Sequence, residues 1–294
     1  MPGKAKKDAP FVVAIVPARY ASTRFPGKPL VDLRGRPMIA HVVERVAATP
    51  SVTRVVVATD DERIAAAARA PGVDVVMTAP ELPSGTDRIA QALERMRLPR
   101  SPHLVLNVQG DEPLIDPDDL DALVVGTLRA GTPMGTLARP LVDLERARRP
   151  EVVKVVVGQE GRALYFSRAL IPFDRDAVDR DAFEPAAPDA PVRYPPALPW
   201  QHVGVYAFRP DALARFTKLA PTPLERTEKL EQLRAIEHGL AITIVPCVSE
   251  APSLAIDVPD DVPAVLAALD ALEAEDDPTD DDPTEDPSSE ESHA

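Results

Sequence analysis

The sequence contains very little cysteine, because Cys247 is the only one among 294 residues. A single thiol excludes a disulfide framework and any zinc site built from cysteines. This usage suits a reducing compartment, so we expect a cytoplasmic protein. Cys247 lies in the apolar segment ITIVPCV (242–248), which favours a place in the core over a role as a nucleophile.

Long hydrophobic runs are also missing. No apolar run approaches the roughly 20 residues of a membrane-spanning helix. The first residues, MPGKAKKDAP, lack the hydrophobic region of a signal peptide. We therefore expect no membrane segment and no export. The 45% of hydrophobic residues is nevertheless ample for a globular core.

Positive charge is scarce relative to negative charge, and the net charge is -14. Residues 273–294 contain eleven Asp and Glu and no Lys or Arg, so the remainder carries -14 + 11 = -3. Such a composition predicts a disordered acidic tail at 273–294, and we expect no nucleic-acid partner. We also expect a disordered N-terminus (1–9), one domain at 10–272 and a Pro-rich loop or insertion at 172–199.

The first informative stretch is VPARYASTRFPGKPL (16–30), which directly follows the apolar run 11–16. That run predicts a buried strand, and the following loop has three cations and no carboxylate: Arg19, Arg24 and Lys28. Hydroxyls of Ser22 and Thr23 and amides near Gly27 could bind phosphate oxygens. The loop matches neither GxGxxG nor GxxxxGK[ST], and on local grounds a solvated basic turn stays an alternative.

Further strands alternate with helices along the chain. Apolar runs predict strands at 54–60, 73–78 and 104–113, with helices between them, which favours a mostly parallel sheet. Ligands then bind beyond the carboxyl ends of the strands. Shorter pieces at 134–141, 152–158 and 163–169 predict a smaller antiparallel portion. A strand at 202–210, one helix at 222–239 and a terminal helix after Asp257 complete the α/β expectation.

Two local patterns point to a site while leaving simpler interpretations open. Ser84 precedes an amphipathic run, which is typical of a helix N-cap. Asp111 lies at the end of the predicted strand 104–113, where a carboxylate could hold Mg²⁺ together with substrate phosphates. A turn-stabilising aspartate would give the same local pattern.

Several motifs together resemble those of the cytidylyltransferases that activate 3-deoxy-manno-octulosonate (Kdo). They span about residues 10–270 in family order: PARYASTRFPGKPL, SGTDR, NVQGDEP, ALYFSRA, HVGVY and LEQLR. The resemblance implies one Rossmann-like nucleotide-diphospho-sugar transferase fold with α/β/α layers, whose antiparallel portion supplies a homodimer contact. It also implies transfer of CMP from CTP to the anomeric 2-hydroxyl of Kdo with Mg²⁺, for lipopolysaccharide biosynthesis.

The resemblance also assigns roles to residues of this chain. The implied catalytic residues are Arg24, Lys28, Asp111 and Asp257, of which Asp111 and Asp257 are the metal ligands. The implied nucleotide-binding residues are Arg19, Arg24, Lys28, Ser84, Arg88 and Gln109. The implied sugar-acid-binding residues are Arg168, His202, Tyr206, Glu231 and Gln232.

The chain departs from the family pattern around Asp257. The family usually shows G-(I/V)-D-T-P-E-D, whereas this chain has Ala255 and Val258 in place of the Gly and Thr. Two other functions stay open: a cytidylyltransferase for another keto sugar acid, such as a sialic acid or an amino derivative of Kdo, and a catalytically silent nucleotide-binding regulator. Retention of Asp111 together with Asp257 argues against the regulator, since binding alone does not need both carboxylates.

Overall fold

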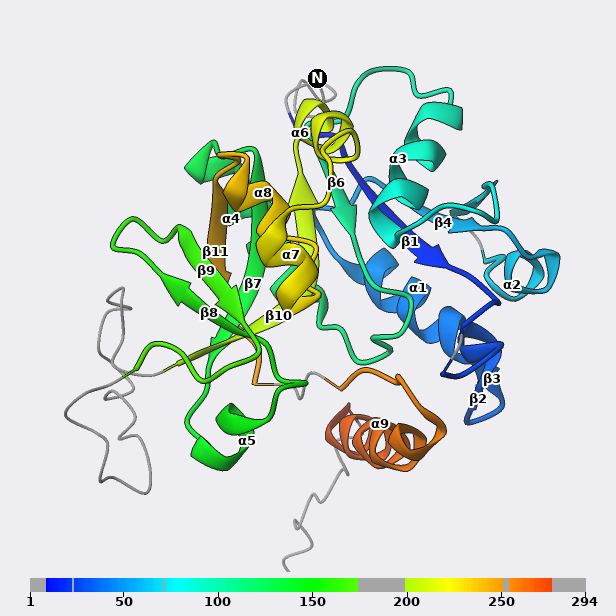
Figure 1. Cartoon of the computed structure of the whole chain (residues 1–294). Helices are drawn as coiled ribbons and strands as arrows, with labels where there is room; N and C mark the ends of the chain where they lie inside the picture. The colour runs from blue at the N-terminus through cyan, green and yellow to red at the C-terminus, as the bar shows by residue number, and fades with distance from the viewer. Residues whose placement is uncertain (1–8, 23, 71, 174–198, 251–253, 277–294) are drawn as a thin grey trace, which may run out of the picture.

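A computed structural model describes residues 9–22, 24–70, 72–173, 199–250 and 254–276. A central sheet forms the body (Figure 1). Its strands, in spatial order, are β11 (Ile242–Pro246), β7 (Met134–Pro140), β10 (Trp200–Phe208), β6 (Leu104–Asn107), β1 (Val12–Ala18), β4 (Arg54–Thr59) and β5 (Val73–Met77).

Most neighbours in this sheet are parallel. Strand β1 pairs in parallel with β4 and β6, β4 with β5, and β11 with β7. Strand β10 runs antiparallel between β6 and β7. The predicted mostly parallel α/β sheet is therefore confirmed, and the carboxyl ends of β1 and β6 lie side by side.

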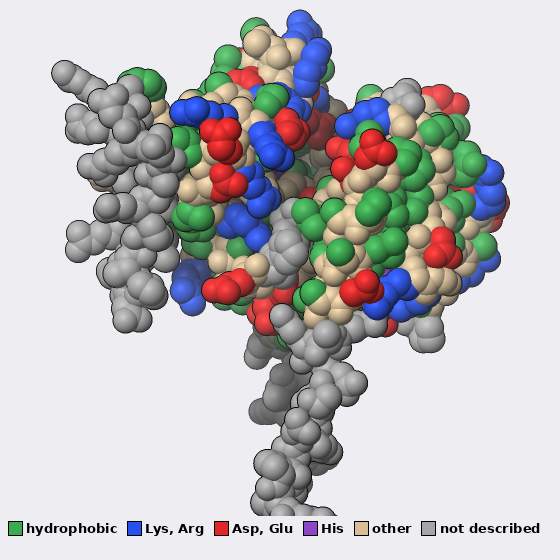
Figure 2. Space-filling model, turned by 90° about the horizontal axis from the view of Figure 1, so that it is seen from below, with side chains coloured by type: hydrophobic (Ala, Val, Ile, Leu, Met, Phe, Trp, Pro, Cys, Tyr) green, Lys and Arg blue, Asp and Glu red, His purple; other side chains and the backbone are tan. Residues whose placement is uncertain are grey.

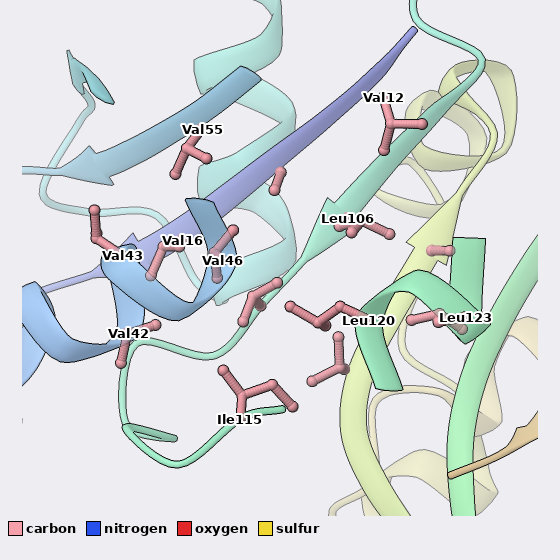
Figure 3. Close-up of a cluster of buried hydrophobic side chains, with 14 of the residues drawn as sticks. Val12, Val16, Val42, Val43, Val46, Val55, Leu106, Ile115, Leu120 and Leu123 are labelled. Carbon is pink, nitrogen blue, oxygen red and sulfur yellow. The ribbon is translucent and has the colours of Figure 1, made fainter. Parts of the chain in front are cut away.

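Helices cover both faces of the sheet. On one face α1 (Met38–Ala48) and α4 (Pro117–Ala130) pack on the strands, and Figure 3 shows Val42, Val46, Leu120 and Leu123 facing Val16 and Leu106. On the other face a second core contains residues of α3 (Gly85–Arg95), α6 (Pro210–Phe216) and α8 (Leu233–Glu237). Burial of these apolar faces stabilises the predicted α/β/α layers.

The three segments predicted for the antiparallel portion form β7, β8 (Lys154–Val157) and β9 (Ala163–Ser167), and each has an antiparallel partner. Strands β8 and β9 form a hairpin whose β8 pairs with the start of β10, and α5 (Leu144–Arg148) lies below it (Figure 1). Strand β7 pairs antiparallel with β10 and parallel with β11, and β7, β8 and β9 all belong to the same sheet. Lys154 is fully buried, and its Nζ donates to the carbonyl oxygens of Arg149, Val152 and Arg168.

The terminal helix α9 (Val262–Asp276) covers a third apolar cluster beside the hairpin of β2 (Asp32–Leu33) and β3 (Arg36–Pro37). From below, hydrophobic side chains cover much of the half that contains α9, while Lys and Arg gather on the other half (Figure 2). Helix α9 continues past the expected tail boundary at residue 272, and 277–294 lie outside the described residues. Neither α9 nor any other described helix is long and apolar enough to cross a membrane.

The single helix predicted at 222–239 is wrong. The structure has α7 (Pro223–Glu228) and α8, with a turn between them. Lys229 ends α7 because it adopts a left-handed conformation with φ 56°, which breaks the helical path. Glu231 and Gln232 therefore lie in the turn between α7 and α8. The predicted loop at 172–199 falls almost entirely outside the described residues.

Candidate active site

A cavity of about 310 Å³ opens beyond the carboxyl ends of β1 and β6. It combines the cationic loop, the start of α3 and the segment after β6; its polar lining includes Arg19, Ser22, Arg24, Lys28, Ser84, Arg88, Gln109, Asp111 and Asp257. Gly110 allows the two strand ends to meet, since a Cβ there would lie 2.8 Å from the Pro17 carbonyl oxygen. The cavity is thus at the edge where a parallel sheet binds ligands.

The cationic loop is closed on itself. The Tyr20 carbonyl oxygen accepts hydrogen bonds from the backbone N–H groups of Ser22 and Gly27, each at 2.9 Å. Gly27 has φ 74° and packs against the Tyr20 ring, so a side chain there would be strained and crowded. The Arg63 guanidinium, paired with Asp61, lies 3.5 Å from the centroid of that ring. This closure fixes the position of the short 3-10 helix Lys28–Leu30. Thr23, which the sequence also suggested as a phosphate ligand, is not among the described residues.

Two aspartates far apart in the sequence meet across Lys28. Its Nζ donates to Asp111 Oδ2 at 2.6 Å and to Asp257 Oδ1 at 3.2 Å. Arg24 forms a bidentate pair with the same Asp257, at 2.9 and 3.2 Å. Because one ammonium group touches both carboxylates, the structure brings Asp111 and Asp257 to one cavity, as the sequence analysis required.

Backbone contacts hold Asp257 in this place despite the altered residues around it. The Ile256 N–H donates to the Asp111 carbonyl oxygen at 2.9 Å, which ties the two aspartates together through their main chains. Asp261 Oδ2 accepts hydrogen bonds from the N–H groups of Asp257 and Val258, at 2.7 and 2.9 Å. Asp261 thus stabilises the turn where the family's Thr is replaced by Val258.

The donor set fits a magnesium ion that arrives with phosphates. Within the described residues, no group of three or more His, Cys, Asp and Glu side chains could enclose a metal. Mg²⁺ is usually bound by one or two carboxylates, with phosphates and water completing its shell. Asp111 and Asp257, beside a cationic loop suited to the phosphates, have this chemistry.

The first turn of α3 supplies the opposite wall. Ser84 caps the helix, because its hydroxyl accepts the Asp87 N–H. Arg88 is 3% exposed and lies 3.4 Å from Asp60, and its Nη1 contacts the Thr78 hydroxyl. Burial lowers the pKa of Arg88. In the described part of the chain its buried Nη2 has no hydrogen-bond partner, and Arg88 lines the cavity.

Strand β10 places two predicted sugar-acid residues on one face. The rings of His202 and Tyr206 have centroids 5.4 Å apart, with Gly204 between them in the sequence. The Gly204 carbonyl oxygen accepts Gln109 Nε2 at 3.2 Å, which links this strand to the nucleotide side. Glu112 packs beside Gly204, and burial together with Asp111 raises the pKa of Glu112 to about 8.

His202 should bind as a neutral hydrogen-bonding group. Burial lowers its pKa to about 3, and its Nε2 lies 3.0 Å from the Thr136 hydroxyl. Since protonation then requires a pH near that value, we expect no titration of this ring between about pH 5 and pH 9. Imidazole NMR shifts, assigned with His202→Gln, check this expectation. A midpoint near the ordinary 6.5 would contradict it.

Glu231 and Gln232 are placed differently from each other. Glu231 Oε2 accepts the Thr86 hydroxyl at 2.6 Å, and the carboxylate belongs to a second cavity of about 550 Å³ that also includes Ser84, Asp87 and Arg234. Gln232 is 5% exposed and precedes α8. Among the lining residues described for these two cavities Gln232 is absent, so its predicted contact with a sugar stays a prediction.

Arg168 lies apart from both cavities as they are described. Its Nε donates to the Glu228 carbonyl oxygen at 2.8 Å and its Nη1 to that of Pro150 at 3.0 Å. Glu228 also accepts the Arg168 N–H and the Ser167 hydroxyl. A contact of Arg168 with a sugar carboxylate therefore stays a prediction.

Sequence reasoning missed several residues that shape the site. Tyr20 and Arg63 hold the cationic loop, and Asp261 holds Asp257. Thr86 and Glu112 lie within the SGTDR and NVQGDEP motifs, which assign no role to either residue. The partners of Thr86 and Arg63, which are Glu231 and Tyr20, lie far away in the chain, so no local pattern could identify these two contacts.

Comparison with known proteins gives a consistent result. A family profile described as cytidylyltransferase matches residues 13–242. The 3-deoxy-manno-octulosonate cytidylyltransferase of Syntrophotalea carbinolica is 46% identical over 89% of this chain and 99% of its own length; that of Anaeromyxobacter dehalogenans strain 2CP-C is 48% identical over 88% and 98%.

A solved structure extends this likeness to three dimensions. A CMP:2-keto-3-deoxy-manno-octonic acid synthetase complexed with CTP matches with a TM-score of 0.76 and 37% identity, over 90% of this chain and 99% of that one. The family profile spans all the residues that line the first cavity except Asp257. The chain therefore belongs to the cytidylyltransferase family and, within it, to the 3-deoxy-manno-octulosonate cytidylyltransferases.

Proposed function

We propose that this protein transfers the CMP group of CTP to the anomeric 2-hydroxyl of 3-deoxy-manno-octulosonate. The hydroxyl oxygen attacks the α-phosphorus and forms the new O–P bond, while the bond from that phosphorus to the bridging oxygen of the β-phosphate breaks. Its electron pair leaves with pyrophosphate, and the hydroxyl proton passes to solvent. The product CMP-Kdo would supply lipopolysaccharide biosynthesis.

The nucleotide half follows from the cavity that contains the cationic loop. Arg24 and Lys28 would bind the β- and γ-phosphates and stabilise the charge that develops on the departing pyrophosphate. Arg19, exposed at the cavity wall, and Gln109 would hold the remainder of the nucleotide. Arg88 would donate its unpaired Nη2 to the acceptor edge of cytosine, next to Ser84.

The sugar-acid half would lie along β10 and the turn between α7 and α8. His202 and Tyr206 present polar groups from one strand face, and Glu231 would accept sugar hydroxyls. Gln232 and Arg168 complete this proposed set, Arg168 as the bidentate partner of the sugar carboxylate. The Gln109 contact with Gly204 would keep this half aligned with the α-phosphate.

Magnesium is the cofactor we propose, with Asp111 and Asp257 as its protein ligands. When bound, Mg²⁺ supplies charge neutralisation at the phosphates and lowers the pKa of the attacking hydroxyl. The chain's own contribution is to hold the two carboxylates together through the Ile256 N–H bond to Asp111. No side-chain general base is needed in this scheme.

One observation carries the proposal: two cations and two carboxylates converge at the strand ends, in a chain that matches its relatives over almost their full length. Incubation with CTP, Mg²⁺ and Kdo should release pyrophosphate and yield CMP-Kdo, detected by coupled phosphate assay and mass spectrometry. Release with a sialic acid or an amino derivative of Kdo, but not with Kdo, would identify a different sugar-acid substrate. No release with any of them would favour a silent nucleotide-binding protein.

We also propose a homodimer that works in the cytoplasm, where CTP is available. Large hydrophobic side chains remain exposed around the β8–β9 hairpin and α5: Val142 (49%), Leu164 (58%) and Phe173 (79%). We infer that these exposed side chains take part in the contact between two protomers. Light scattering after size-exclusion chromatography should give twice the 31.7 kDa chain mass, and Leu164→Glu should reduce it to one chain.

A further inference from the structure

The first turn of α3 separates the two cavities of the site. Ser84 lines both of them, with Gly85 and Arg88 facing the first and Asp87 facing the second. Thr86 lies in this wall and is 4% exposed. Its hydroxyl donates to Glu231 Oε2 at 2.6 Å, across 145 positions of the sequence.

Thr86 has no part in holding the helix itself. Ser84 already provides the cap, and its hydroxyl bonds both the Asp87 N–H and the Asp87 carboxylate. In the described part of the chain, Glu231 is the hydrogen-bond partner of the Thr86 hydroxyl. A buried hydroxyl that spans two elements in this way serves the group it bonds, here a carboxylate on a turn.

Glu231 needs such support because of its surroundings. It is partly removed from water, and Asp87 of α3 adds a second negative charge nearby; both raise its pKa. The hydroxyls of Thr86 and Ser84 and the charge of Arg234, 3.8 Å away, act in the opposite direction. Tyr206 of β10 also faces this carboxylate. The N-terminal end of α3 further favours negative charge.

We propose that Thr86 is a positioning residue for sugar-acid recognition, which orients the Glu231 carboxylate from the helix that also lines the nucleotide cavity. This inference rests on the proposed role of Glu231 as a sugar-acid ligand. It assigns to one short turn two tasks: its outer side contacts the nucleotide, and its inner hydroxyl fixes the sugar-binding carboxylate. Loss of the Thr86 hydroxyl should therefore weaken the binding of the sugar acid and leave the binding of CTP nearly unchanged.

Thr86→Val tests this because valine keeps the shape and removes the donor. We expect the KM for Kdo to rise roughly tenfold, the size of one hydrogen bond to a charged group, while the KM for CTP stays within about twofold. Thr86→Ser should restore the wild-type value. Thr127→Val, a similarly buried threonine of α4 whose Oγ1 has no hydrogen-bond partner in the described part of the chain, is the matched control and should change neither KM.

A double-mutant cycle with Glu231→Gln decides whether Thr86 acts through Glu231. In the Glu231→Gln background, Thr86→Val should add little further to the KM for Kdo. The inference would be overturned if Thr86→Val raised the KM for Kdo as much in the Glu231→Gln background as in the wild-type protein. It would also be overturned if Thr86→Val alone left the KM for Kdo unchanged, or raised the KM for CTP as much as the KM for Kdo. Isothermal titration calorimetry of Kdo binding to the same variants, without metal, measures the affinity directly. It tests whether Thr86 acts through Glu231 without any need for turnover. Absent turnover of the wild-type protein would contradict the proposed function alone.

Discussion

Replacement of Asp111 by asparagine is expected to reduce kcat by at least about 10³-fold while the protein keeps its fold. The carboxylate is one of the two proposed magnesium ligands, and a bound metal contributes several kcal/mol to stabilisation of the transition state. The hydrogen bond from the Ile256 N–H to the main-chain carbonyl of residue 111 does not involve the substituted side chain and should persist. Lys28 also keeps its second partner, Asp257, at 3.2 Å. Pyrophosphate release at saturating CTP and Kdo measures kcat, and circular dichroism measures thermal unfolding.

Asp116→Asn is the matched control for this variant. Asp116 caps α4 by accepting the Asp118 N–H at 2.8 Å, and asparagine is an equally good cap. We therefore expect nearly wild-type kcat and an unchanged melting temperature from it. Near wild-type turnover of Asp111→Asn would show that the metal assignment is wrong, whereas a collapsed melting transition would show a structural role.

The sequence predicts the parts of this fold that depend on neighbouring residues. The buried strands at 11–16 and 54–60 contain the uninterrupted apolar stretches 11–16 and 55–58, and the helix between them repeats apolar residues at helical spacing. The cationic loop is local too, since its three cations lie within ten residues. The resemblance then supplied Asp257, whose distance in sequence from Asp111 hides their contact.

The break between α7 and α8 shows where local reasoning fails. Residues 222–239 have the apolar spacing of one continuous helix, with a capping box at Thr222. The left-handed conformation of Lys229 is unfavourable for a residue with a side chain, so tertiary contacts must support it. One such contact is the Thr86 bond to Glu231. Pairing between residues so far apart leaves no signal in a single sequence.

The placement of β7 and β10 has the same origin. Each segment is recognisable as a strand, but nothing in either one specifies that β10 inserts antiparallel between β6 and β7. That insertion brings His202 and Tyr206 next to the segment after β6, where Gln109 reaches the Gly204 carbonyl. The sugar-acid half of the site is therefore a product of topology, while the nucleotide half is largely encoded in contiguous motifs.

The charges of the site satisfy one another. Arg24 and Lys28, which would bind phosphates, pair with Asp111 and Asp257, which would bind the metal. Each group is thereby held near its working position. The triphosphate can then take over the cations at the same time as the metal takes over the carboxylates, so nucleotide and metal binding should favour each other.

Lys28→Met should separate the two roles of this lysine by changing two measurements in opposite directions. Turnover should fall by about 10²- to 10³-fold, because the charge on the departing pyrophosphate loses a preorganised cation. Binding of a divalent metal to the protein without nucleotide should instead become tighter, because both carboxylates lose the ammonium group that lies 2.6 and 3.2 Å from them. Pyrophosphate release measures the first effect, and Mn²⁺ titration followed by electron paramagnetic resonance measures the second.

Lys218→Met is the control for this last variant, since Lys218 is exposed and follows α6, outside the residues that line either cavity as described. It should leave both turnover and Mn²⁺ affinity unchanged. If Lys28→Met weakens Mn²⁺ binding along with turnover, the lysine maintains the shape of the site and does not compete with the metal. If Mn²⁺ binding tightens while turnover stays normal, Lys28 neutralises the carboxylates but makes no contribution to pyrophosphate departure.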